Sequence, residues 1–113
     1  DIGPLLTHRT KIVRLALEGK TMTQICGIMR HSTQAVNNYL SIFVRCVHLK
    51  QKGMQPGQIA FLLRRGKGLI QQYLDIIDEC ESDNNMSYHL DELTNIVAPS
   101  NRKKKSQRKR AND

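Results

Sequence analysis

The sequence contains an internal repeat with a spacing of 34 residues, and this repeat restricts the possible folds more than any other feature. When residues 11–43 are aligned without a gap with residues 45–77, nine of the 33 positions are identical. The identical pairs include Gly19/Gly53, Arg30/Arg64 and Tyr39/Tyr73. The repeat predicts two copies of one supersecondary unit. A helical solenoid has repeats of similar length but needs more copies, so it is the weaker interpretation.

Each copy has the residue pattern of three helices. In the first copy, apolar residues recur at helical spacing over about 8–18 and a glycine follows. Thr21 and Gln24 then fit a capping box at the start of a second helix. After a short turn, Ser32 caps a third helix over about 33–43.

The second copy repeats this logic, with a first helix from residue 45, Gly53 after it, Pro56 near the next helix start and Gly66 in the turn. The inward positions of the two third helices are apolar or aromatic: Val36, Tyr39, Leu40, Phe43, Ile70, Tyr73, Leu74 and Ile77. Because the aromatic rings lie on these apolar stripes, we assign them to the core and not to stacking on nucleic-acid bases.

Residues 25–40, ICGIMRHSTQAVNNYL, resemble the helix-turn-helix segments of many bacterial and archaeal regulators and transposon proteins. Those segments commonly read Ile-Ala-x-x-x-Gly-x-Ser-x-x-Thr-Val-x-x-Tyr-Leu. Here Cys26 replaces the small alanine and Arg30 replaces the turn glycine, which requires a positive φ angle or a remodelled turn. The second copy keeps Ala60 and has an arginine in the turn. Residues 5–80 are similar to an uncharacterised prokaryotic family of tandem helix-turn-helix proteins.

Charge divides the chain into three segments. Residues 1–74 hold eleven Lys and Arg against two acids, a net charge of +9. Residues 75–97 hold seven acids and no Lys or Arg, and residues 98–113 hold seven basic residues and one acid. A basic body with a basic end is typical of proteins that bind polyanions. The acidic segment is expected to lie away from any DNA-binding face.

These patterns predict an all-α protein with two tandem three-helix helix-turn-helix units, over residues 1–44 and 45–81. An acidic loop and a short helix follow over 82–98, with Ser87 as the cap and Leu90, Leu93 and Val97 on one face. Residues 99–113 are predicted to be a disordered basic tail.

The third helix of a helix-turn-helix unit enters the major groove, where its outward N-terminal side chains contact base edges. The candidate base readers are therefore the outward polar residues of the two third helices: Thr33, Gln34, Asn37, Asn38, Lys67, Gln71 and Gln72. Asn and Gln both donate and accept, which suits the N6/N7 edge of adenine. Two adjacent Asn residues are poor helix formers, so their presence favours a role in recognition over an unoccupied polar surface.

Contacts to phosphates are expected from basic and polar side chains around the turns and on the first helices. The candidates are Arg9, Lys11, Arg30, His31, Ser41, Arg45, Arg64 and Arg65, with further support from Arg14, Lys50 and Lys52. Arg65 can alternatively read guanine. In the tail, the basic residues Arg102, Lys103, Lys104, Lys105, Arg108, Lys109 and Arg110 are expected to attract any polyanion without sequence preference.

No sequence motif of an enzyme is present, and we expect no catalytic residue and no cofactor. Three widely spaced cysteines and four scattered histidines lack the spacing of metal ligands, so reduced thiols and no metal are expected. No apolar run is long enough to cross a membrane. The expected partner is double-stranded DNA in a prokaryotic cytoplasm, at the nucleoid, with a second copy or the transcription machinery as possible protein partners.

The favoured function is transcriptional regulation through two adjacent major-groove segments. Two alternatives stay open from the sequence. The chain can be the DNA-end-recognition module of a transposase or recombinase, or a helical protein-interaction adaptor in which only the tail touches nucleic acid.

Overall fold

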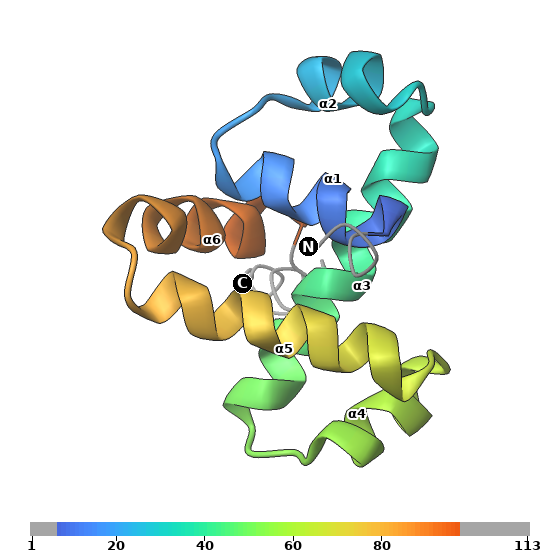
Figure 1. The fold of residues 1–113 in the computed structure, drawn as a ribbon, viewed down its shortest axis with the longest axis vertical. Coiled ribbons are helices and arrows are strands. Elements are labelled where there is room, and N and C mark those ends of the chain that lie inside the picture. Colours follow the sequence, from blue (N-terminus) through green and yellow to red (C-terminus); the bar gives the residue numbers. More distant parts are fainter. Residues whose placement is uncertain (1–6, 98–113) are drawn as a thin grey trace, which may run out of the picture.

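The computed structural model describes the backbone of residues 7–97 and the side chains of residues 7–95. These residues form helices only, so the predicted all-α class is confirmed for this part of the chain. The helices are α1 (His8–Leu17), α2 (Met22–Met29), α3 (Thr33–Gln51), α4 (Pro56–Leu63), α5 (Lys67–Glu81) and α6 (Asn84–Val97), as shown in Figure 1. The predicted basic tail, residues 99–113, lies outside the described residues.

Side-chain caps define the helix starts that the sequence predicted. At the start of α2, Thr21 Oγ1 accepts a hydrogen bond from the Gln24 backbone N–H at 3.1 Å, and Gln24 Oε1 accepts one from the Thr21 N–H at 2.8 Å. At the start of α3, Ser32 Oγ accepts from the Ala35 N–H at 3.1 Å. Pro56 occupies the first turn of α4. The capping box, the serine cap and the proline position are thus confirmed.

Both short helices end in a left-handed residue that is not glycine. Arg30 has a φ angle of 59° after α2, and Arg64 has a φ angle of 56° after α4. This conformation costs an L-residue with a side chain about 1–2 kcal/mol. The backbone N–H groups of the two arginines donate to carbonyls of the preceding helix and so close its end. Of the two possibilities that the sequence left at this turn, the structure adopts the positive φ angle.

Helix α3 is longer than predicted. The sequence analysis ended one helix at residue 43 and began another at residue 45, and this break is wrong, because α3 continues from Thr33 to Gln51. The physical reason is that residues 33–51 contain no glycine or proline, while the buried Val44 and Val47 extend the apolar stripe past the repeat boundary. The third helix of the first repeat and the first helix of the second repeat are therefore one helix.

The connection between α5 and the last helix is shorter than predicted. The end of α5 at Glu81 agrees with the predicted end of the second unit, but only Ser82 and Asp83 precede α6, which begins at Asn84 and is not capped by Ser87. Asp83 is the capping residue, since its Oδ1 accepts a hydrogen bond from the Met86 N–H at 3.1 Å. Helix α6 folds back against α1 and α5. Leu93 is buried there and Leu90 packs against the same core, whereas the side chain of Val97 lies outside the description.

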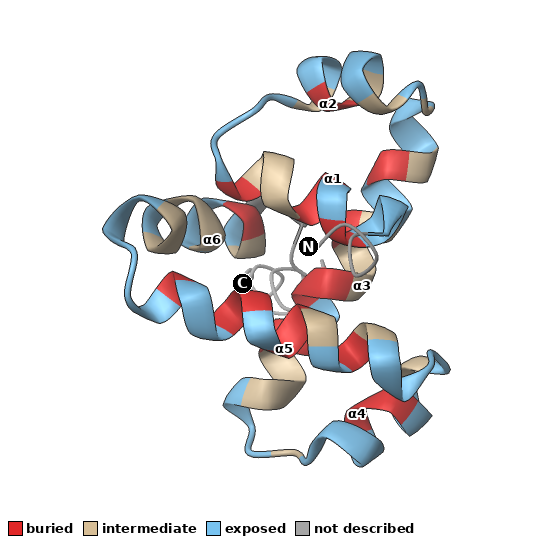
Figure 2. Ribbon diagram, in the orientation of Figure 1, coloured by how far each residue is buried: buried red, intermediate tan, exposed pale blue. Residues whose placement is uncertain are grey.

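One hydrophobic core connects the two repeats. Buried residues from all six helices belong to a single cluster, and Figure 2 shows the buried positions of α1, α3 and α5 converging in the middle of the molecule. At its centre the rings of Phe43 on α3 and Tyr73 on α5 meet edge to face, with centroids 5.3 Å apart. Both rings are fully buried and Tyr39 is half-buried, which places these aromatic residues in or against the core as predicted.

We expect Gly19→Ala to destabilise the fold more than Gly53→Ala. Both glycines have positive φ angles, so each variant incurs the same backbone cost, about 1–2 kcal/mol. Only at Gly19 would the new Cβ meet another side chain, 2.9 Å from Nε2 of His89 on α6, whereas nothing lies within 4 Å at Gly53. Denaturant unfolding measures the difference. In a His89→Ala background the two losses should become equal, and equal losses in the wild-type background would contradict the prediction.

Candidate nucleic-acid interface

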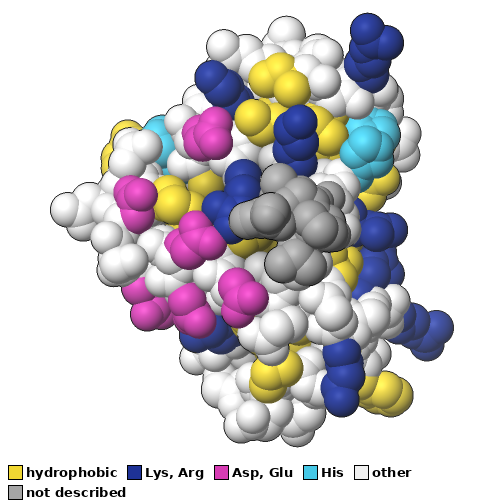
Figure 3. All heavy atoms as spheres, in the orientation of Figure 1, with side chains coloured by type: hydrophobic (Ala, Val, Ile, Leu, Met, Phe, Trp, Pro, Cys, Tyr) yellow, Lys and Arg dark blue, Asp and Glu magenta, His cyan; other side chains and the backbone are white. Residues whose placement is uncertain are grey.

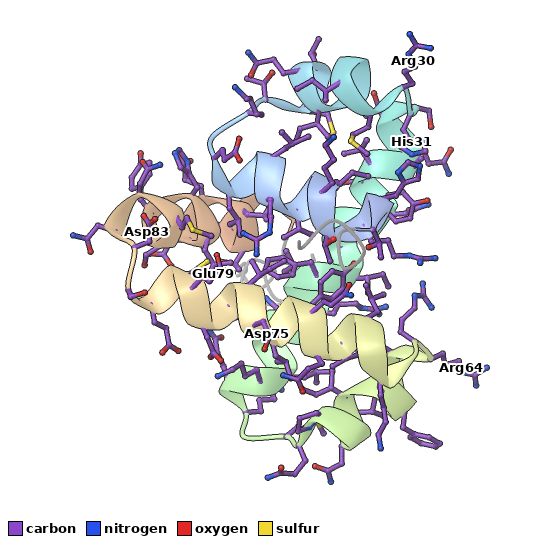
Figure 4. The ribbon with its side chains drawn as sticks, viewed as in Figure 1. Arg30, His31, Arg64, Asp75, Glu79 and Asp83 are labelled. Carbon is purple, nitrogen blue, oxygen red and sulfur yellow. The ribbon has the colours of Figure 1, made fainter. Side chains whose placement is uncertain are left out.

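The first turns of α3 and α5 lie along the same edge of the molecule. Figure 4 shows Arg30, His31 and Arg64 along this edge, on the right of the view, whereas Glu79 and Asp83 lie on the left. Each first turn is preceded by an eight-residue helix and a left-handed arginine. We call the surface formed by the two turn arginines and by residues 33–38 and 67–72 the basic edge.

The α3 part of the basic edge presents the four side chains that were predicted to contact bases. Thr33, Gln34, Asn37 and Asn38 are all exposed. Thr33 Oγ1 lies 3.8 Å from the sulfur of Cys26, which links this first turn to α2. The carboxamide groups of Asn37 and Asn38 are accessible, and each carries both hydrogen-bond donors and an acceptor. This part of α3 therefore has the chemistry needed to recognise a base edge.

The α5 part is less accessible. Lys67 is exposed, but Gln71 Nε2 donates to Oδ1 of Asp75 at 3.0 Å within the same helix. The side-chain oxygen of Gln72 is buried and has no hydrogen-bond partner among the described residues. Asp75 occupies the repeat position that corresponds to Ser41, and it brings a negative charge to α5. In this conformation α5 offers fewer polar atoms to a base edge than α3 does.

A ring cluster holds the start of α1 against the turn before α3. The imidazole of His31 contacts the rings of His8 and Tyr39 edge to face, with centroids 5.3 Å and 5.8 Å away. The guanidinium of Arg9 lies over the Tyr39 ring, 5.7 Å from its centroid, in a cation–π contact. Because Nε2 of His31 is buried, this histidine supports the turn by packing, a role that the sequence analysis missed.

The remaining residues that were predicted to contact phosphates differ in their exposure and in whether their side chains already have a hydrogen-bond partner. Arg65 donates from one guanidinium nitrogen to the carbonyl oxygens of Leu63 and Arg64, both at 3.1 Å, and so closes the end of α4. Lys11, Arg30, Arg45 and Arg64 are exposed and Ser41 is half-buried. Arg65 therefore has a structural contact in addition to its charge.

Two cations that the sequence analysis assigned to DNA contacts form ion pairs within the fold. Arg14 on α1 donates two hydrogen bonds to Glu79 on α5, at 3.0 Å and 2.6 Å. This bidentate pair raises the pKa of Arg14 and lowers the pKa of Glu79. Lys50 on α3 lies 3.9 Å from Asp78. The acidic end of α5 thus joins α1 and α3, and no local sequence pattern could have indicated pairs so far apart along the chain.

The surface charge is segregated. In Figure 3 the acidic side chains lie on the left, most of them over α5 and α6, whereas Lys and Arg side chains line the right-hand side and also occur among the acidic ones. The basic edge lies on that right-hand side. A positive electrostatic potential along one edge favours the approach of a polyanion to that edge in a defined orientation. Glu79 and Asp83 lie away from the basic edge, but Asp75, the first residue of the acidic segment, is hydrogen-bonded to Gln71 within it, so the expected separation holds only in part.

Other kinds of site find little support among the described residues. No group of three His, Cys, Asp or Glu side chains is placed to hold a metal ion in residues 7–95. Burial raises the pKa of the thiols of Cys46 and Cys80 to about 11, so both are protonated at neutral pH. A small pocket of about 180 Å³ lies between α3, α5 and α6, with Val47, Ile77 and Leu90 among its lining residues. Over the described range, none of the helices has the length and apolar character required to cross a lipid bilayer.

The described residues form an all-α protein in which one arrangement occurs twice. In each copy a short helix ends at an arginine in the left-handed conformation, and a longer helix with polar side chains in its first turn follows. The chain belongs to the family described as protein of unknown function DUF1670, whose family model matches residues 1–76. The match covers the first repeat and all but one residue of the second, and it leaves out α6. No curated protein and no solved structure has a significant match to this chain.

Proposed function

We propose that this protein binds double-stranded DNA through two tandem helix-turn-helix units and acts as a transcriptional regulator. In this proposal α2 and the first half of α3 form one unit, and α4 and α5 form the other. The first turns of α3 and α5 would enter neighbouring major-groove segments. For helices in successive major grooves on one side of the duplex, the two contact centres are about one helical turn, roughly 34 Å, apart.

The observation that carries the proposal is the repeated geometry along the basic edge. Two eight-residue helices end in left-handed arginines, and each is followed by a helix whose exposed first turn points to the same edge. A helix N-terminus carries unpaired backbone N–H groups and a partial positive charge, which together attract a phosphate. Arg30 and Arg64 add a full charge at each of these two helix starts.

The two units would contribute differently to binding. Asn37 and Asn38 present accessible carboxamides, so we propose that α3 supplies most of the sequence preference, with adenine as the preferred partner. On α5, the hydrogen bond from Gln71 to Asp75 and the buried oxygen of Gln72 leave mainly cationic contacts. We propose that the second unit acts chiefly on phosphates, while the basic tail adds affinity without sequence preference.

The test is a selection from random duplex DNA with the full chain, followed by anisotropy measurements at two salt concentrations. Enrichment of a two-part motif with centres about one turn apart is the expected result. Asn37→Ala with Asn38→Ala should weaken the α3 half of this motif by about tenfold or more, because each bidentate base contact contributes roughly 1–3 kcal/mol. The matched control is Asn84→Ala, at an exposed asparagine at the start of α6, away from the basic edge.

The other outcomes separate the remaining functions. Salt-sensitive binding without an enriched motif would contradict sequence-specific regulation and indicate a packaging role. Absence of duplex binding would favour the protein-interaction adaptor. A motif that occurs only at the termini of mobile elements would identify a transposase or recombinase module.

A further inference from the structure

Two exposed surfaces, each with an aromatic ring and with charges of opposite sign, lie on different sides of the molecule. The first consists of Gln58, Phe61 and Leu62 on α4 and of Arg65, which lies two residues beyond the end of that helix. The Phe61 side chain is 80% exposed and Leu62 is 51% exposed, although both are apolar. Figure 3 shows apolar side chains beside Lys and Arg side chains at this lower end of the molecule. We call it the α4 surface.

The second surface, which we call the α6 surface, runs along the outer side of α6. It consists of the exposed residues Asn85, Tyr88, Asp91 and Glu92, and Tyr88 is 60% exposed. Glu92 is held at this surface by a contact of 2.9 Å between its Oε1 and Nδ1 of His89. The surface combines one aromatic ring with carboxylates, whereas the α4 surface combines one aromatic ring with a guanidinium.

We propose that copies of this chain associate head to tail, with the α4 surface of one copy packed against the α6 surface of the next. Phe61 and Leu62 of one copy would cover the Tyr88 ring of the other. Arg65 would face the carboxylates of Asp91 and Glu92. The burial of aromatic rings supplies the affinity, and the opposite charges select the partner and its orientation.

Each surface carries one exposed aromatic ring and a charge of one sign. On α6, Glu92 follows Tyr88 by about one helical turn. At the α4 surface, Arg65 follows the left-handed Arg64 and stands at the C-terminal end of the helix, two residues beyond Leu63. A contact of ring with ring therefore pairs a cationic surface with an acidic one. Two copies of the same surface cannot pair in this way, because two α4 surfaces or two α6 surfaces would bring like charges together.

A contact between two different surfaces leaves the dimer with one unoccupied α4 surface and one unoccupied α6 surface, so further copies can bind at either end. In Figure 1 α4 lies at the lower end of the molecule and α6 at the left, so one copy can use both at once. Helix α6 is also remote from the basic edge. If the proposed DNA binding holds, neighbouring copies on DNA would bind cooperatively, but the association itself does not depend on that function.

The experiment is sedimentation of the full chain in the absence of DNA, over a wide concentration range and at low and high salt. We expect the average mass to rise with concentration and to fall with added salt. Phe61→Glu and Tyr88→Lys should each abolish the rise. A mixture of the two variants should associate again, because each chain retains the surface that the other has lost. Thermal unfolding of each variant verifies that its fold is intact.

The matched control is Ile28→Glu. Ile28 is the repeat equivalent of Leu62 and is 49% exposed on α2, but it belongs to neither surface. This variant should associate like the wild type. A chain that stays monomeric at every concentration overturns the proposal, as would happen if the chain's own basic tail covered the α6 surface. Association that survives Tyr88→Lys overturns it in favour of an α4–α4 contact. A mixture that fails to associate overturns it as well, because the two retained surfaces would then not bind each other.

Discussion

Replacing Arg30 and Arg64 by glycine should make the protein more stable and a weaker DNA binder at the same time. Both arginines have positive φ angles, and the turn hydrogen bonds come from backbone atoms that glycine also has. Glycine is the usual residue at such a helix end, so each replacement should raise the free energy of unfolding by about 1 kcal/mol. The loss of two phosphate contacts should lower the salt dependence of DNA binding by about two units of slope.

Denaturant unfolding and anisotropy on the same samples measure the two effects separately. The control is Arg30→Lys with Arg64→Lys, which keeps the charge and the positive φ angle and should change both quantities little. DNA affinity that is unchanged in the glycine variant would show that the turn arginines do not contact DNA. A loss of stability in that variant would mean that the arginine side chains make contacts that outweigh the backbone strain.

Arg45→Pro should destabilise the protein strongly, although the side chain that it removes is exposed. Arg45 is exposed in the middle of α3, at the point where the two repeats join. Proline there removes a backbone hydrogen bond and collides with the carbonyl of the preceding turn, at a cost of about 3 kcal/mol or more. We expect a corresponding drop in the free energy of unfolding, and a large loss of helical circular dichroism if the remaining stability is small.

Arg45→Ala separates this backbone effect from the loss of the side chain. Alanine is a good helix former at an exposed position, so the free energy of unfolding should stay within about 0.5 kcal/mol of the wild type. If the proline variant were as stable as the alanine variant, α3 would not act as one helix across the two repeats. The second repeat would then be able to move relative to the first.

The sequence predicted the helices where the decisive signals are local. Thr21 with Gln24, Ser32 and Pro56 are capping residues whose effect depends on neighbours three or four positions away, and all were placed correctly. The predicted break within α3 failed for a different reason. The repeat alignment placed a boundary at residue 44, but nothing in the backbone chemistry of residues 33–51 interrupts a helix, and packing keeps it continuous.

The candidate site could be predicted only in part, because several of its side chains are committed to contacts between helices. Arg14 pairs with Glu79, 65 positions later, and this pairing depends on how α1 and α5 pack. The burial of the His31 and Gln72 polar atoms likewise follows from tertiary contacts. The hydrogen bond from Gln71 to Asp75 is different, since a spacing of four residues on a helix is visible in the sequence and could have been found.

The continuous α3 also limits which insertions and deletions this protein can accept during evolution. One added residue within it would rotate everything on one side by about 100° and shift it by about 1.5 Å. The first turn of α5 would then leave the edge that it shares with the first turn of α3. The exposed residues of these turns can be exchanged singly, with small effects on the fold. Relatives with the same helix arrangement are therefore expected to vary in those side chains and to keep the length of α3 unchanged.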